Sequence, residues 1–339
     1  MPLDCVRDNT SISSKGSKTL SRREQRSMEN TSDHTCSTSH FRYPLFTAIY
    51  SLVLLVGLPL NAFSLWKLVR RIGLKSVPVI YMANLALSDL LFTLSLPLRI
   101  LYFSTGVWKL SNISCMIPGT LFSVNLYSSS LFITLISVDR MLAVVYPLRS
   151  RSVHTHFVSW VASVAVWIGI AGLSVPVALN HGVNNDTDCR VSRCFEHFSP
   201  AEWGKGFYIL CIISTLGIFI PFGIIFGCTI AIIQKLRDRA QSTSKGISET
   251  NLDRSKMVRL FLTNLLIYAV CFIPFHVAFI LYGLYKLKKL EYNYFDVQTV
   301  TMCLASTNSC LDPLIYYFSS INIQRNKETR SLRTVLPEH

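Results

Sequence analysis

The sequence has few charged residues, and most of them are basic. Charged side chains make up 15% of the 339 residues, hydrophobic ones make up 50%, and the formal net charge is +14. So low a charge content excludes an intrinsically disordered chain and is unusual for a soluble domain, but it is ordinary for a polytopic membrane protein. We expect no nucleic-acid partner, because the basic residues gather between apolar runs, where membrane orientation requires them.

Cysteine is also sparse, with ten residues that are too scattered for a disulfide scaffold and show no zinc-site spacing. Five lie inside apolar runs, where most thiols are plain packing residues: Cys211, Cys228, Cys271, Cys303 and Cys310. Of the five outside the runs, four could form two disulfides in an oxidising compartment: Cys36, Cys115, Cys189 and Cys194. Four cysteines can pair in three ways, so the residues alone leave the pairing open.

The amino-terminal tail, residues 1–43, lacks the apolar stretch of a cleavable signal peptide, so the first apolar run must act as the anchor. Five basic residues in this tail oppose its export under the positive-inside rule: Lys15, Lys18, Arg22, Arg23 and Arg26. A start at Met28 would remove all five. We therefore hypothesise that Met28, rather than Met1, is the working start.

Seven apolar runs follow, each long enough to cross a hydrocarbon core of about 30 Å as a helix. None shows the alternating pattern of a barrel strand. They cover residues 44–66, 77–103, 116–138, 157–179, 207–233, 260–285 and 297–318. The pattern predicts an all-α membrane protein with a seven-helix domain over residues 44–318, preceded by the tail 1–43 and followed by a short tail, 319–339.

Basic residues predict the orientation of these spans. They are concentrated in the connections after the first, third and fifth runs and in the carboxyl-terminal tail. The amino terminus is therefore expected to be extracellular and the carboxyl terminus cytoplasmic. Four Asn-X-Ser/Thr sequons fall on the predicted outer side, as glycosylation requires: Asn9, Asn30, Asn112 and Asn185.

The third run is bounded by chemically different residues. Residues 116–138 carry no charge, Cys115 precedes them, and the acid–base pair Asp139-Arg140 follows. Other motifs occur in order, one in each remaining run: Asn61 in GLPLNAFSLW, NLALSDLLFTLSLP, Trp167 with Pro176, Pro221, Cys271-Phe-Ile-Pro274 and Asp312-Pro-Leu-Ile-Tyr316. Together they resemble the landmarks of rhodopsin-like G-protein-coupled receptors.

The last motif narrows the resemblance, because it has Asp312 where most of that family has Asn. This variant is typical of the branch that holds nucleotide, proteinase-activated and lysophospholipid receptors. Segments such as YSLVLLVGLPLNAFSLW and CFEHFSPAEW are most similar to the fifth subtype of lysophosphatidic acid receptors, and the similarity covers roughly residues 43–320.

The resemblance implies a plasma-membrane receptor, not an enzyme, for an anionic lysophospholipid, with lysophosphatidic acid as first candidate. Its implied partners are a heterotrimeric G protein and, as a further candidate, arrestin. Cationic side chains above a membrane cavity suit a phosphate, and the ligand-binding candidates are Arg99, Lys286, His276, Arg190 and Arg193. The candidates for activation and G-protein coupling are Asp139, Arg140, Pro274, Pro313 and Tyr316.

The resemblance also implies a disulfide between Cys115 and Cys194, and a Cys36–Cys189 bond is a weaker hypothesis. No cofactor is expected apart from a candidate allosteric sodium ion. Five side chains deep in the runs offer the oxygen ligands that a hard cation prefers: Asp89, Asn125, Ser129, Asn308 and Asp312. A polar cluster without an ion is the alternative.

Three departures from the family pattern lie near the cytoplasmic end. Met141 follows Arg140 where Tyr is usual, Thr229 stands where the fifth helix usually has Tyr, and Arg254 takes the place of an acid that would hold Arg140. These departures predict a weakly locked resting state.

Other classes are less consistent with the sequence. A retinal opsin needs a lysine in the last run, which has none. A transporter should show internal repeats. An acyltransferase is suggested only by the spacing of His181 and Asp186 in a polar loop. A proteinase-activated receptor fits the second outer loop poorly, whereas a nucleotide receptor shares the phosphate chemistry and stays the nearest alternative.

Overall fold

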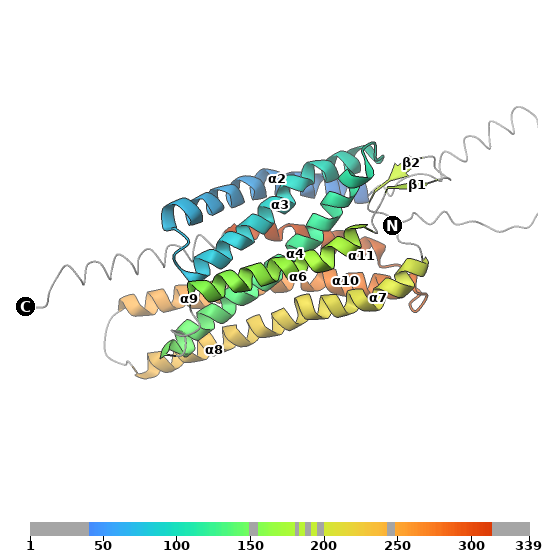
Figure 1. Ribbon diagram of the computed structural model, residues 1–339. Coiled ribbons are helices and arrows are strands. Elements are labelled where there is room, and N and C mark those ends of the chain that lie inside the picture. Colours follow the sequence, from blue (N-terminus) through green and yellow to red (C-terminus); the bar gives the residue numbers. More distant parts are fainter. Residues whose placement is uncertain are drawn as a thin grey trace, which may run out of the picture.

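The computed structural model describes residues 41–148, 155–179, 183–186, 191–194, 200–242 and 248–313. Long helices lie side by side in one bundle, with a small hairpin at one end (Figure 1). The helices are α2 (Arg42–Trp66), α3 (Val77–Thr105), α4 (Asn112–Val145), α6 (His156–Leu179), α7 (Pro200–Ser214), α8 (Ile220–Ser242), α9 (Ser248–Cys271), α10 (Ile273–Lys286) and α11 (Phe295–Ser306). Two π-helical turns, η1 (Lys67–Ile72) and η2 (Thr215–Phe219), follow α2 and α7, and the hairpin pairs β1 (Asn184–Asp186) with β2 (Val191–Arg193).

These elements confirm the predicted helical membrane fold. Six helical segments of the described chain are long and apolar enough to span a bilayer. The seventh expected span begins as α11 and is still helical at Pro313, where the described residues end. Helices α4 and α9 extend beyond the apolar runs 116–138 and 260–285, because a helix that leaves the bilayer keeps its backbone hydrogen bonds while its charged side chains reach water.

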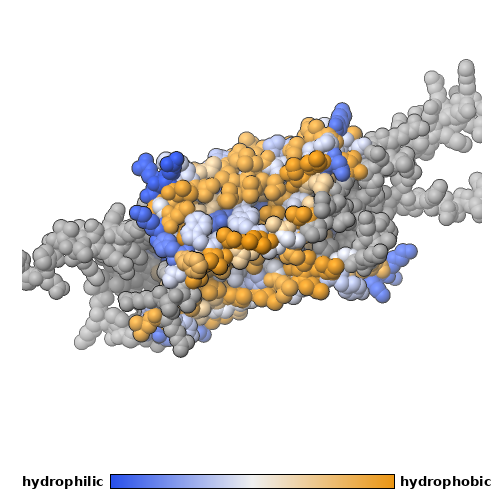
Figure 2. Space-filling view, in the orientation of Figure 1, coloured by the Kyte–Doolittle hydropathy of each residue, from blue (hydrophilic) through white to orange (hydrophobic). Residues whose placement is uncertain are grey.

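The flank of the bundle is apolar, and hydrophilic residues lie toward its ends (Figure 2). Large side chains such as Leu55 and Phe157 are 73% and 77% exposed. Exposure on this scale would be costly in water, but it is expected where lipid tails surround a protein. The surface therefore agrees with a chain embedded in a membrane.

Two proline residues interrupt long helices. Helix α9 ends at Cys271, and α10 starts at Ile273 with Pro274 in its first turn. A proline has no N–H and cannot continue the backbone ladder, so one apolar run becomes two helices. In the neighbouring helix, η2 lies just before Pro221 and separates α7 from α8.

The π turn η2 packs tightly against α4 at a glycine. A Cβ atom built at Gly217 would lie only 2.7 Å from Cδ1 of Tyr127. Ser130 donates a hydrogen bond of 2.6 Å to the carbonyl of Gly217, and the Tyr268 hydroxyl donates one of 3.0 Å to the carbonyl of Ile218. Glycine thus permits the close approach, and hydroxyl groups from two helices pair with the carbonyls of the turn.

Candidate functional site

A disulfide ties the hairpin to the bundle. Cys115, in the first turn of α4, is bonded to Cys194, directly after β2, with 5.8 Å between their Cα atoms. The backbone N–H of Trp108 also donates to the carbonyl of Ser192 at 2.8 Å, which attaches β2 to the loop between α3 and α4. The predicted Cys115–Cys194 pairing is confirmed, whereas Cys36 and Cys189 lie outside the described residues.

Arg99 lies inside the bundle, only 4% exposed, and its guanidinium is held by three hydrogen bonds. Nε and Nη2 donate to the carbonyl of Pro118 at 3.3 and 2.9 Å, and Nη1 donates to the Tyr50 hydroxyl at 3.2 Å. The Cζ atom also lies 5.3 Å from the ring centre of Phe122. Contacts with α2 and α4 therefore fix the position of a positively charged group among aromatic rings.

A second arginine at this end of the bundle, Arg42, is not among the ligand-binding residues expected from the sequence. Arg42, the first residue of α2, is 8% exposed, and its Cζ atom lies 4.9 Å from the ring centre of Phe295 and 5.6 Å from that of Phe103. Cys303 of α11 lies within electrostatic range of both Arg42 and Arg99. The available signal was a basic residue at the start of the first apolar run, on the side expected to be extracellular, where the positive-inside rule disfavours one.

The other predicted ligand contacts lie at different depths. Lys286 is half-buried in the last turn of α10, with Nζ 5.5 Å from the ring centre of Tyr282. His276 is 1% exposed, its Nδ1 lies 2.9 Å from the carbonyl of Phe272, and its Nε2 has no hydrogen-bond partner among the described residues. Arg190 lies outside the described chain, and so does the side chain of Arg193.

The sequon residues differ in what the structure describes. Asn112 begins α4, and its Oδ1 accepts a hydrogen bond of 2.6 Å from the backbone N–H of Val183. Asn185 lies in β1, with its backbone alone described. Asn9 and Asn30 lie outside the described residues, as does Met28. Glycosylation and the start site therefore stay predictions.

The five predicted sodium ligands do gather in the middle of the bundle. The Asn125 amide donates to Asp89 Oδ1 at 2.9 Å and to Ser129 Oγ at 3.4 Å, and the Asn308 amide donates to Asp312 Oδ2 at 2.7 Å. The carboxyl group of Asp89 lies close enough to that of Asp312 to act on it electrostatically.

This donor set fits a hard cation. Two buried carboxyl groups side by side repel each other when both are ionised, unless a cation or a shared proton lies between them. Oδ1 of Asn308 and Oδ1 of Asp312 have no hydrogen-bond partner in the described part of the chain. Oxygen atoms are thus available to coordinate a cation between these side chains, and the residues suit an ion such as sodium.

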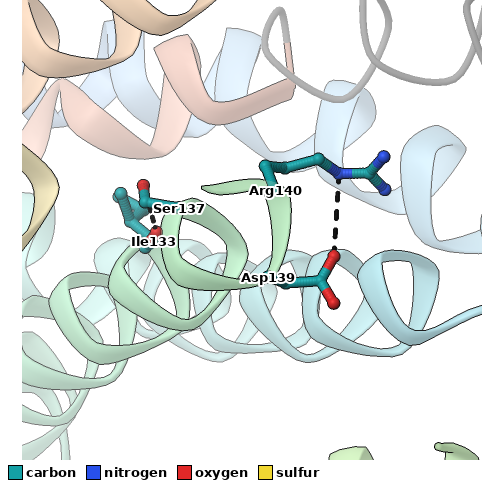
Figure 3. Close-up of polar contacts among 4 residues, drawn as sticks. All are labelled: Ile133, Ser137, Asp139 and Arg140. Atoms are coloured by element: carbon teal, nitrogen blue, oxygen red, sulfur yellow. Dashed lines mark hydrogen bonds and ion pairs between the residues drawn. The ribbon is translucent and has the colours of Figure 1, made fainter. Parts of the chain in front are cut away.

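The acid–base pair lies at the opposite end of α4 from the disulfide. Arg140 Nε is 3.8 Å from Asp139 Oδ2, and Figure 3 shows the two side chains facing each other just after Ser137, whose hydroxyl donates to the carbonyl of Ile133. Asp139 is 7% exposed and Arg140 is 29% exposed. The arginine is therefore held at the edge of the bundle by its neighbour.

The departures near this pair have structural consequences. Met141 packs against an apolar cluster that includes Phe261 of α9. The Thr229 hydroxyl turns back to the carbonyl of Ile225 at 2.8 Å, and so does not reach across to Arg140. Pro313 is buried at the end of the described helix, whereas Tyr316 and the side chain of Arg254 lie outside the described residues.

A helical bundle that crosses a membrane, with a disulfide-bonded hairpin at one end and an Asp-Arg pair at the other, defines a transmembrane receptor. The comparison with known families agrees. The chain belongs to the rhodopsin family of seven-transmembrane receptors, whose family model, "7 transmembrane receptor (rhodopsin family)", matches residues 60–316. Members of this family are multi-pass plasma-membrane receptors that couple to G proteins and are not enzymes, so the acyltransferase and transporter alternatives are wrong.

Curated relatives are similar over most of the chain. Lysophosphatidic acid receptor 6 of Gallus gallus is 33% identical over 292 residues, which are 84% of this chain and 93% of the relative. Lysophosphatidic acid receptor 4 of Homo sapiens is 34% identical over 305 residues, 87% of this chain and 80% of the relative. Lysophosphatidic acid receptor 5 of Mus musculus is 37% identical over 302 residues, 86% of this chain and 79% of the relative.

Proposed function

We propose that this protein is a cell-surface receptor for an anionic lysophospholipid, with lysophosphatidic acid as the first candidate. The observation that carries the proposal is the buried guanidinium of Arg99, held among aromatic side chains inside a membrane bundle. The names of three relatives, all lysophosphatidic acid receptors, support the same ligand class.

Arg99 suits a phosphate for physical reasons. An arginine stays charged and presents a planar fork of N–H groups, which matches a phosphate bidentately. Its three bonds to Pro118 and Tyr50 orient the guanidinium group in advance, so little side-chain entropy remains to be lost when a phosphate replaces the Pro118 carbonyl. Arg42 and Lys286 would add positive charge from α2 and α10, and Arg190 and Arg193 are further candidates from the second outer loop.

An apolar chain suits the side chains deeper in the bundle. Phe122 packs edge-on against Phe275 with ring centres 5.5 Å apart, and His276 lies next to Phe275 at 5.1 Å. A ligand whose phosphate lies at Arg99 would therefore extend its tail along aromatic side chains. Each buried methylene contributes about 0.8 kcal/mol, which makes chain length an energetic variable.

The proposed orientation puts the hairpin end outside the cell and the Asp139–Arg140 end in the cytoplasm. A disulfide is stable in the oxidising extracellular space, and basic residues follow α2 at the opposite end. Arg140 is held by Asp139 at rest, and its release on activation would open a groove for a G-protein helix, with arrestin as a further partner of the same end. The sodium ion proposed between Asp89 and Asp312 would link the ligand site to that end.

A nucleotide receptor is the second candidate, because buried cations bind any phosphate. The two candidates differ in the rest of the ligand, which is polar in a nucleotide and apolar in a lysophospholipid. A panel of lysophosphatidic acids of increasing chain length and a panel of nucleotides, applied to cells that express the chain, would separate them. We expect G-protein dissociation only with the lysophospholipids, at a potency that rises with chain length until the cavity is full. Activation by nucleotides alone would refute the proposal.

A further inference from the structure

The end of α2 and the turn after it carry a basic surface for which the receptor function gives no role. The π turn η1 contains Lys67, Arg70 and Arg71, and Lys75 follows shortly after. Between residues 41 and 88 the sequence has no acidic residue. Figure 2 shows hydrophilic residues gathered at the end of the bundle where α2 ends, next to the apolar flank.

Backbone conformation keeps these cations together. Gly73 adopts a φ of 75°, in the left-handed region that favours glycine. The N–H of Lys75 then donates to the carbonyl of Gly73 at 2.7 Å, which closes a tight turn. A Cβ atom at Gly73 would lie 3.8 Å from Cγ of Lys75. The turn therefore places the side chain of Lys75 against Gly73, the residue directly after η1.

Three of the four cations are presented to the surroundings. Arg70, Arg71 and Lys75 are exposed, and within the described part of the chain no ion pair involves them. Lys67 is half-buried and already interacts with another group of the protein. The surface thus offers two guanidinium forks and one ammonium group.

Large apolar side chains border these cations on the membrane side. Phe63 is 57% exposed, Trp66 is 48% exposed and Val69 is 41% exposed. Arg71 lies with its Cζ 5.5 Å from the ring centre of Trp66. Tryptophan prefers the membrane–water interface, so Arg71 and its neighbours lie at the depth of lipid headgroups.

We propose that η1, together with Lys75, binds a membrane phospholipid with a polyphosphorylated headgroup, of the phosphoinositide class. Each phosphomonoester carries about −1.5 to −2 charges near neutral pH, so such a headgroup matches several cations at once. The Arg70 and Arg71 forks bind phosphate oxygens, Lys75 adds a third cation, and Phe63 and Trp66 contact the acyl chains. In the proposed orientation this end faces the cytoplasmic leaflet, where anionic lipids are concentrated.

A different result is expected if the basic residues serve only to orient the receptor in the membrane. Orientation in the membrane requires only positive charge, whereas a phosphoinositide site also depends on guanidinium geometry and on an acyl contact. Full-length receptor should therefore be placed in nanodiscs of phosphatidylcholine that contain either phosphatidylinositol 4,5-bisphosphate or phosphatidylserine. Bound lipid is then counted by native mass spectrometry after release.

We expect the wild type to retain the phosphoinositide in preference to phosphatidylserine. Each surface cation raises the affinity for an anionic lipid roughly fivefold. The variant without three of them, Arg70→Gln/Arg71→Gln/Lys75→Gln, should therefore bind the phosphoinositide roughly a hundredfold more weakly. The control removes three exposed lysines from the other end of the bundle, Lys109→Gln/Lys288→Gln/Lys289→Gln, and should bind as the wild type does. Equal retention of both lipids, or an equal loss in the control, would overturn the proposal.

A second variant tests the proposal even if the charge-removing variant misfolds or inserts into the membrane in the opposite orientation. Arg70→Lys/Arg71→Lys keeps the charge and hence the orientation, but it removes the planar forks. This variant should bind the phosphoinositide more weakly than the wild type does, and phosphatidylserine equally well. Undiminished binding of the phosphoinositide would overturn the assignment. Soluble inositol trisphosphate serves as competitor and should compete poorly because it lacks acyl chains. Competition as strong as that of the lipid would show a site for free phosphates instead.

Discussion

The hydroxyl groups of Ser130 and Tyr268 lie 2.5 Å apart, where α4 meets α9. Both also lie within hydrogen-bonding distance of carbonyls of the π turn η2, at Gly217 and Ile218, so two hydroxyl protons serve three contacts. Three helical segments are thus joined by two hydroxyl groups in a region without water, where an unpaired carbonyl is costly. The contact therefore connects α4 and η2 to α9, the helix that ends just before Pro274.

Replacement of Tyr268 by Phe should destabilise the receptor without changing its shape. The ring still stacks on Phe272, but Ile218 loses its donor, and hydrogen bonds of this kind in membrane proteins average about 0.6 kcal/mol. We expect a small drop in the unfolding temperature of the purified receptor. Tyr208→Phe, at a side chain that is 66% exposed, is the control and should have no effect. Equal melting of both variants and the wild type would show that the contact adds nothing.

Addition of a methyl group at Gly217 should be harmful, although alanine normally favours helices. Its Cβ would lie 2.7 Å from Cδ1 of Tyr127, whereas at Gly223 nothing lies within 4 Å. Overpacking of this kind costs about 1–3 kcal/mol. Gly217→Ala should therefore lower the unfolding temperature, and Gly223→Ala should leave it unchanged or raise it. The packing argument fails if both alanines behave alike.

Loss of Arg99 should reduce the potency of lysophosphatidic acid sharply. Loss of a cation that contacts a buried phosphate weakens ligand binding by about 2–5 kcal/mol. Arg99→Ala should have the largest effect and Lys286→Ala a smaller one, measured as G-protein dissociation at matched surface expression. Lys109→Ala removes an exposed charge from the same end and is the control. A normal response of Arg99→Ala would place the phosphate elsewhere.

Asp89→Asn should blunt any sodium dependence of agonist affinity, because a carboxylate is the hardest ligand in its cluster. The measurement is agonist binding with sodium or with a large organic cation at the same ionic strength. Asp296→Asn, exposed in the first turn of α11, controls for the loss of one negative charge. Undiminished sodium sensitivity of Asp89→Asn would mean that the cluster only stabilises the structure.

Much of the fold follows from local properties that can be read in the sequence. The length and low charge of the runs predict spans, because an unpaired backbone cannot exist in lipid. Proline positions such as Pro274 predict an interrupted helix, and the cysteines outside the runs predict a disulfide. The sodium candidates, from Asp89 to Asp312, also come together as expected, since polar side chains in a bundle turn away from lipid.

The tertiary structure decided which groups meet. Arg42 and Arg99 are 57 positions apart in the numbering, yet both lie near Cys303, because α2, α3 and α11 pack at one end of the bundle. The contact of Ser130 with Tyr268 and the close approach of Gly217 to Tyr127 likewise depend on how helices are rotated about their axes. An apolar run determines that a helix crosses the membrane. Its rotation and neighbours are set by side-chain packing among all the helices at once.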